Sequence, residues 1–199
     1  MADDTIHDEV PDPKRRDALI KATTAAGGLG LAIAAYPFLA SLAPSERAKA
    51  LGAPVAVDFA ALPPGDLMTV GWRGRPVWIL HRTPQMLASL ETAAPLLVDP
   101  QSERTSQQPD YARNRERSIK PEYLVTVALC THLGCVPTFV PQPGAVEKDW
   151  PGGFYCPCHG SKFDLAGRVF KDVPAPTNLV IPPYKYVGST EILVGVDSA

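Results

Sequence analysis

The sequence has few cysteines and little net charge, and both shortages narrow the possible functions. Its four cysteines all lie in two short segments of a 199-residue chain, which is typical of a site and not of a small disulfide-held domain. The formal net charge is −2 and no basic stripe is visible, so we expect no nucleic-acid partner. With 22 prolines and 15 glycines, the composition favours short strands and many turns over a helical bundle.

Charged residues are absent from residues 22–44. As a helix this stretch would span about 34 Å, enough to cross a hydrocarbon core of about 30 Å. A buried soluble helix is the alternative, but such helices usually carry a polar stripe, and this stretch has none. We therefore expect a transmembrane anchor. More basic residues precede it than follow it, which predicts a cytoplasmic N-terminus and an exported C-terminal domain.

The N-terminal tail contains the pair Arg15-Arg16, which resembles a twin-arginine export signal. A chance pair of arginines and a cleaved signal peptide are the alternatives, but Pro44 disfavours cleavage after Ala43, so we expect an uncleaved anchor. The expected organisation is a cytoplasmic tail (1–21), the anchor (22–44), a flexible tether (45–54) and a folded domain (55–199).

The folded domain is predicted to be mainly β, an antiparallel sandwich carrying a small inserted subdomain at about 120–181. A helix is expected over 83–94, since good helix formers follow a proline near its start. The polar stretch 99–120 is expected to be a solvent-facing loop. Alternating or short apolar runs between turn residues predict strands at 55–59, 68–72, 76–81, 123–129, 163–164, 169–170, 179–181, 184–187 and 191–196.

Two short segments carry the chemistry. One is CTHLGC, residues 130–135, and the other is CPCHGS, residues 156–161. Together they offer two thiolates and two imidazoles, a set that suits Zn²⁺ or a mixed-ligand iron–sulfur centre. The two remaining cysteines are available to join the segments by a disulfide. His7 and His81 have no second ligand near them in the sequence, so we interpret both as structural or solvated.

These segments, with KPEYLV before the first and PAPTNL after the second, resemble the Rieske iron–sulfur protein of cytochrome bc1 complexes, the quinol–cytochrome c reductases. The resemblance implies a Rieske-type antiparallel β-sandwich with an inserted cluster-binding subdomain and one [2Fe–2S] cluster. It also implies that one iron is bound by Cys130 and Cys156, the other by His132 and His159, and that Cys135 and Cys158 form a disulfide.

The same resemblance implies roles around the cluster. Ser161 would donate its hydroxyl to a bridging sulfide, and Leu133 would cover the cluster where it meets the quinol pocket. Pro174 lies in the segment 173–176, which resembles the proline loop that shields the other side. Phe163 departs from the pattern, because many members have a tyrosine there whose phenol bonds a cysteine sulfur.

The implied function is electron transfer from ubiquinol or a related quinol to cytochrome c1, coupled to proton uptake at His132 or His159 and contributing to proton translocation. The implied partners are cytochrome b and cytochrome c1 in a dimeric bc1 complex of a bacterial inner membrane, with the cluster domain in the periplasm. One alternative is the Rieske subunit of another exported oxidoreductase, of the arsenite oxidase or b6f type. A soluble-type Rieske ferredoxin, an oxygenase domain and a zinc-stabilised module are further alternatives.

Phe163 generates a prediction. A hydrogen bond to sulfur favours the reduced, more negative cluster, so the chain's reduction potential should lie below that of tyrosine-bearing relatives. Phe163→Tyr should raise the midpoint potential, measured by an EPR-monitored redox titration. An unchanged potential would contradict this interpretation.

Overall fold

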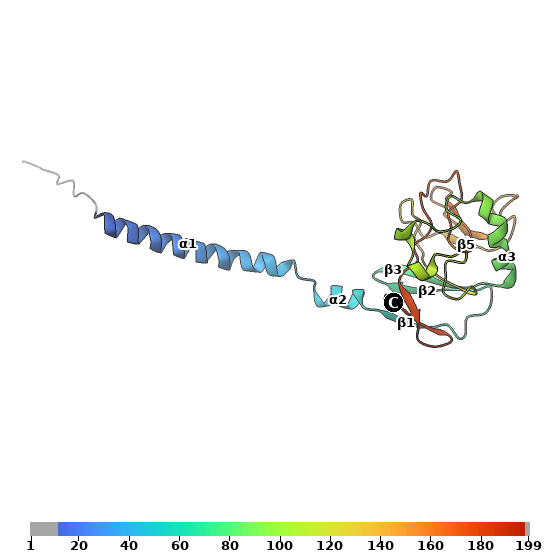
Figure 1. The fold of residues 1–199 in the computed structure, drawn as a ribbon, viewed down its shortest axis with the longest axis horizontal. Helices are drawn as coiled ribbons and strands as arrows, with labels where there is room; N and C mark the ends of the chain where they lie inside the picture. Colours follow the sequence, from blue (N-terminus) through green and yellow to red (C-terminus); the bar gives the residue numbers. More distant parts are fainter. Residues whose placement is uncertain (1–11, 198–199) are drawn as a thin grey trace, which may run out of the picture. The chain divides into compact units, whose positions relative to one another are not determined.

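The computed structural model describes residues 12–197. The chain divides into two compact units between Lys49 and Ala50, and each is described by itself. Figure 1 shows the fold of both.

The first unit is dominated by helix α1, Pro13–Ser41. Asp12 caps its N-terminus by accepting a hydrogen bond from the Lys14 amide at 3.0 Å, and Pro13 occupies the first turn, where a missing N–H is harmless. No residue of α1 is buried. By length and composition, the helical region Pro13–Gly52 is able to cross a membrane, and it is the one such region among residues 12–197. Its second part is the short helix α2, Glu46–Gly52, which occupies most of the expected tether.

The second unit contains three antiparallel three-stranded sheets (Figure 1). The first sheet has the order β1-β9-β8, the second β2-β3-β4 and the third β5-β6-β7. The strands are β1 (Val55–Asp58), β2 (Leu67–Trp72), β3 (Arg75–His81), β4 (Tyr123–Val127), β5 (Thr138–Val140), β6 (Gly153–Tyr155), β7 (Lys162–Phe163), β8 (Tyr184–Tyr186) and β9 (Glu191–Val194).

Local sequence explains several of these elements. A two-residue turn, Arg73-Gly74, joins β2 to β3, and both residues have positive φ (50° and 70°), which matches the right-handed twist of a hairpin. Helix α3, Pro84–Ala93, begins where the Thr83 hydroxyl accepts a hydrogen bond from the Met86 amide at 3.3 Å. The 83–94 helix prediction is therefore confirmed.

The strand predictions were right for most of the domain and wrong in four places. Residues 179–181 form no strand: the Val127 amide donates to the Val180 carbonyl and the Ile181 amide to Gln107, each at 2.8 Å, so they bridge β4 and a loop without a regular ladder. Residues 169–170 form only isolated bridges. Neither β5 nor β6 was expected as a strand. Strand β4 pairs with β3, so the third sheet begins after β4.

The prediction that residues 99–120 face solvent was right for only part of the segment: residues 103–106 are exposed, but others are buried. Arg117 is fully buried and Ser102 is fully buried. The Arg117 guanidinium donates to the carbonyls of Ala166 and Gly167 at 3.2 and 3.3 Å. These bonds replace the hydration that burial removes, so the charged side chain of Arg117 can lie inside the domain. We call residues 99–120 the insertion.

Two further arginines share this interior. Arg82 reaches the carbonyl of Glu116 at 2.8 Å and that of Leu165 at 3.2 Å. Burial lowers the pKa of both Arg82 and Arg117 to about 10. Arg168 forms a buried ion pair with Asp164 at 2.7 Å. Asp164 stabilises the charge of all three arginines. It pairs with Arg168, and its negative charge raises the pKa of Arg82 and Arg117 against the lowering that burial causes.

This arrangement generates a prediction. Asp164→Asn keeps the side chain's shape but leaves buried guanidinium charge without its counter-ion, which typically destabilises a protein by about 3–5 kcal/mol. We expect a large fall in the melting temperature of the full chain, followed by circular dichroism.

The matched control is Glu147→Gln, which breaks the Lys162–Glu147 pair at 2.7 Å. That pair is partly exposed, and such pairs contribute at most about 1 kcal/mol. Equal melting temperatures for the two variants would contradict the structural role given to Asp164.

Candidate functional site

The two cysteine–histidine segments occupy neighbouring loops of the third sheet. The first, residues 130–135, lies in the connection between β4 and β5, and the second, residues 156–161, joins β6 directly to β7. Strands β5 and β6 are antiparallel neighbours in one sheet, with Thr138 opposite Tyr155. The loop before β5 and the loop after β6 therefore lie at the same end of that sheet.

The first loop is closed by its own backbone. The Cys130 amide donates to the Cys135 carbonyl at 2.8 Å, and the Gly134 amide donates to the Cys130 carbonyl at 2.9 Å. Gly134 has a φ of 82°, a left-handed conformation that a residue without Cβ adopts readily. The loop is therefore tied at the base, and its tip carries His132 and Leu133.

The second loop repeats this pattern. The Cys156 amide donates to the Ser161 carbonyl at 2.8 Å, and the Gly160 amide donates to the Cys156 carbonyl at 2.9 Å. Gly160 has a φ of 77°. The two loops thus share one backbone design although their histidines stand two and three residues after the first cysteine.

A disulfide between Cys135 and Cys158 joins the loops, as the family resemblance implied. Cys130 and Cys156 are free and buried, and the rings of His132 and His159 have centroids 4.8 Å apart. The structure therefore brings the two histidine rings together, and it also brings the two free thiols together, since the Cys156 side chain contacts that of Cys130.

Burial differs between the two ligand types. The side chains of Cys130 and Cys156 are only 3% and 2% exposed, whereas His132 is half-buried and His159 is exposed. Burial raises the pKa of the Cys156 thiol, so a thiolate needs a positive partner there, and a metal ion supplies one. The sulfurs of Cys135 and Cys158 lie close to that of Cys156, but their disulfide leaves them no thiolate to offer.

Ser161 is fully buried beside these cysteines. Its hydroxyl oxygen accepts a hydrogen bond from the Ala175 amide at 3.0 Å, while its own proton has no acceptor among residues 12–197. A buried hydroxyl normally donates its proton, so an acceptor at the cluster position would complete its bonding. This fits a group with sulfide atoms at the site.

The segment 173–177, which we call the proline loop, covers the other side. Besides the Ala175–Ser161 bond, the Thr131 hydroxyl donates to the Thr177 carbonyl at 2.6 Å. The proline loop is thus bound to both cluster loops. Pro174 is exposed on it. The sequence analysis did not single out Thr131, whose only signal was its place between a cysteine and a histidine.

The remaining predicted residues are placed as follows. Leu133 is 73% exposed at the tip of the first loop. Phe163 is fully buried on β7, opposite Phe154. His81 Nδ1 lies 2.8 Å from the Leu62 carbonyl and its ring packs on Tyr123, which agrees with a structural role. His7 lies outside the described residues.

Comparison with known proteins identifies the families concerned. Residues 102–185 match the model of the Rieske [2Fe-2S] domain, which confirms the predicted fold class and cofactor. Residues 5–45 match a model described as the TAT signal of the ubiquinol–cytochrome c reductase Fe-S subunit, and this range includes Arg15-Arg16.

Relatives cover nearly the whole chain. The ubiquinol-cytochrome c reductase iron-sulfur subunit of Allochromatium vinosum is 58% identical over 92% of this chain and 89% of its own length. That of Blastochloris viridis is 42% identical over 96% and 98%. A chain of a hyperthermophilic respiratory Complex III structure is 26% identical, with coverage of 88% and 98% and a TM-score of 0.46. The chain belongs to the family of ubiquinol-cytochrome c reductase iron-sulfur subunits.

Proposed function

We propose that this chain is the electron-transfer subunit of a quinol–cytochrome c reductase. Cys130 and Cys156 would hold one iron of a [2Fe–2S] cluster, and His132 and His159 would hold the other. The observation that carries the proposal is the pair of accessible imidazoles, with ring centroids 4.8 Å apart, beside two buried free cysteines.

The ligand set suits a centre that must accept electrons from quinol. Two thiolates contribute two negative charges and two neutral imidazoles contribute none, whereas four thiolates would contribute four. A less negative site accepts an electron more readily, so exchanging two cysteines for histidines raises the reduction potential. When bound, a cluster held by these residues would supply one-electron transfer from quinol to cytochrome c1.

The histidines add a proton function. An imidazole that binds iron through Nδ1 leaves Nε2 outside, where it can lose or gain a proton. His159 is exposed and His132 half-buried, so a quinol hydroxyl can reach a ring nitrogen. A deprotonated imidazole accepts the hydrogen bond from that hydroxyl and then its proton, which links electron uptake to proton uptake.

The surface around the histidines is apolar. Leu133 is 73% exposed and Val136 is 52% exposed, and Pro174 is exposed beside them on the proline loop. Exposed apolar side chains next to a reactive centre are typical of an interaction site. We propose that this surface docks on cytochrome b, where Leu133 packs at the quinol pocket.

The N-terminal region supplies the location. We propose that residues 22–44, most of which lie in α1, form a single-pass anchor in a bacterial inner membrane, with residues 1–21 in the cytoplasm, residues 45–54 as the tether and residues 55–199 in the periplasm. The Arg15-Arg16 pair would direct export of the folded domain, and the Cys135–Cys158 disulfide suits an oxidising compartment. The assembly would be a dimeric bc1 complex with cytochrome b and cytochrome c1.

The alternatives explain less. A soluble-type ferredoxin or an oxygenase domain needs neither the disulfide nor an anchor. A zinc module would not need the buried Ser161 hydroxyl beside the free cysteines. Relatives of the arsenite oxidase and b6f types are disfavoured by 58% identity to a ubiquinol-cytochrome c reductase subunit over 92% of the chain.

The ligand assignment gives a first prediction. His159→Ala removes one of four ligands and should abolish cluster insertion, which the loss of the EPR signal and of bound iron would report. The matched control is His81→Ala, which removes an imidazole whose one hydrogen-bond partner among the described residues is the Leu62 carbonyl. It should retain the cluster. An intact cluster in the His159 variant would contradict the assignment.

The docking surface gives a second prediction. Leu133→Asp places a charge where an apolar contact is proposed, and we expect quinol–cytochrome c turnover to fall roughly tenfold, the size of a central interface contact. Turnover would be measured in membranes that contain the assembled complex.

The matched control is Val187→Asp, at an apolar residue that is 52% exposed and is not on the docking surface. Its turnover should be unchanged. Equal rates for the wild type and Leu133→Asp, with the cluster intact in both, would argue against quinol oxidation at this surface.

A further inference from the structure

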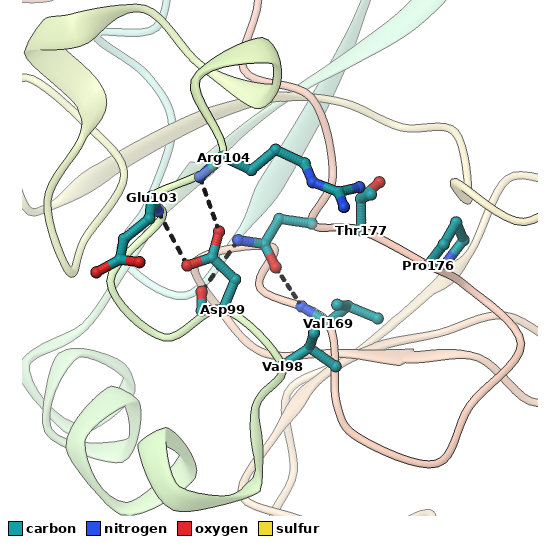
Figure 2. A pocket seen from close by; sticks show the side chains of 8 residues that line it. Val98, Asp99, Glu103, Arg104, Val169, Pro176 and Thr177 are labelled. Atoms are coloured by element: carbon teal, nitrogen blue, oxygen red, sulfur yellow. Dashed lines mark hydrogen bonds between the residues drawn. The ribbon is translucent and has the colours of Figure 1, made fainter.

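A cleft of about 270 Å³ separates the insertion from the proline loop. Figure 2 shows Asp99, Glu103 and Arg104 on one side and Pro176 and Thr177 on the other. The insertion is fixed to the core by its buried arginine, whereas the proline loop lies against the cluster loops. A contact across this cleft would therefore connect the proline loop, which lies on the cluster loops, to the insertion and the core.

Asn178 makes that connection. Its side-chain amide donates to the Asp99 carbonyl at 3.2 Å, and its side-chain oxygen accepts from the Val169 amide at 2.8 Å. Asn178 is only 1% exposed. Within residues 12–197, the bond to Asp99 is the one hydrogen bond that joins the insertion to residues 173–178.

A stiff segment, residues 174–176, lies between Asn178 and the second cluster loop. Pro176 and Pro174 flank Ala175, and each proline fixes its own φ. The Ala175 amide in turn donates to the Ser161 hydroxyl at 3.0 Å. A shift at Asn178 therefore moves Ala175, and with it the bond that holds Ser161.

We propose that Asn178 is a positioning residue for electron transfer. It holds the proline loop so that the Ala175 amide bonds the Ser161 oxygen, which leaves the Ser161 proton free to donate to a bound cluster. This inference rests on the proposed function, because it requires the cluster. Asn178 would thus affect the reduction potential through Ser161, without touching the cluster itself.

The first test is the midpoint potential of the full chain with its cluster. Asn178→Ala should lower the reduction equilibrium constant about fivefold, the size expected when one hydrogen bond is weakened. The matched control is Asn114→Ala. Asn114 bridges the Tyr111 and Ser118 carbonyls at 3.1 and 2.9 Å within the insertion, and its removal should leave the potential unchanged. An unchanged potential in Asn178→Ala would overturn the proposal.

A double-mutant cycle separates positioning from a general loss of structure. If Asn178 acts through Ser161, then Asn178→Ala should cause no further shift in the Ser161→Ala background. The same shift in both backgrounds would show that Asn178 does not act through the serine hydroxyl. Should Asn178→Ala fail to assemble the cluster, the isosteric Asn178→Asp is measured in the same two backgrounds, and additivity again overturns the proposal.

A readout that does not depend on potential is hydrogen exchange at the Ala175 amide, followed by mass spectrometry. The exchange rate should rise in Asn178→Ala and stay at the wild-type value in Asn114→Ala. Equal protection in all three chains would overturn the proposal. Absence of iron from the wild-type chain would instead refute the proposed function, so the two failures are distinguishable.

Discussion

The site depends on holding two separate loops face to face. Each loop closes on itself through the same pair of backbone hydrogen bonds, from the first cysteine amide and from the glycine amide, and the Cys135–Cys158 disulfide then joins the two. Neither loop carries a complete ligand set. A centre that needs two thiolates and two imidazoles can form only if both loops keep this relative position, which a covalent link restricts most directly.

The two kinds of proposed ligand also differ in solvent exposure. The free cysteines are buried, whereas His132 is half-buried and His159 is exposed, so in the proposed site the cysteines would hold their iron on the protein side and the histidines would hold theirs toward solvent. Electrons and protons can therefore be exchanged at the same exposed end. The proline loop completes the enclosure, because Thr131 and Ser161 bind it to one loop each.

The sequence was sufficient for the parts that depend on local pattern. The cysteine–histidine motifs led to the family, the fold class and the disulfide pairing, and alternating apolar residues located β1 to β3. It failed for the insertion, because its charges suggested a solvated loop. Arg117 is buried there against carbonyls about fifty positions away, and contacts of such separation leave no periodic signal. Asn178 was missed for the same reason, since its partners Asp99 and Val169 come from two distant segments.

The most direct test of the account is an EPR-monitored redox titration of the full chain at several pH values. We predict a rhombic [2Fe–2S] signal with a positive midpoint potential that falls as the pH rises above neutral, because reduction is linked to proton uptake at a histidine ligand. A negative potential that does not change with pH would contradict a proton-coupled quinol oxidant. Zinc in place of iron in properly matured protein would contradict the cluster itself.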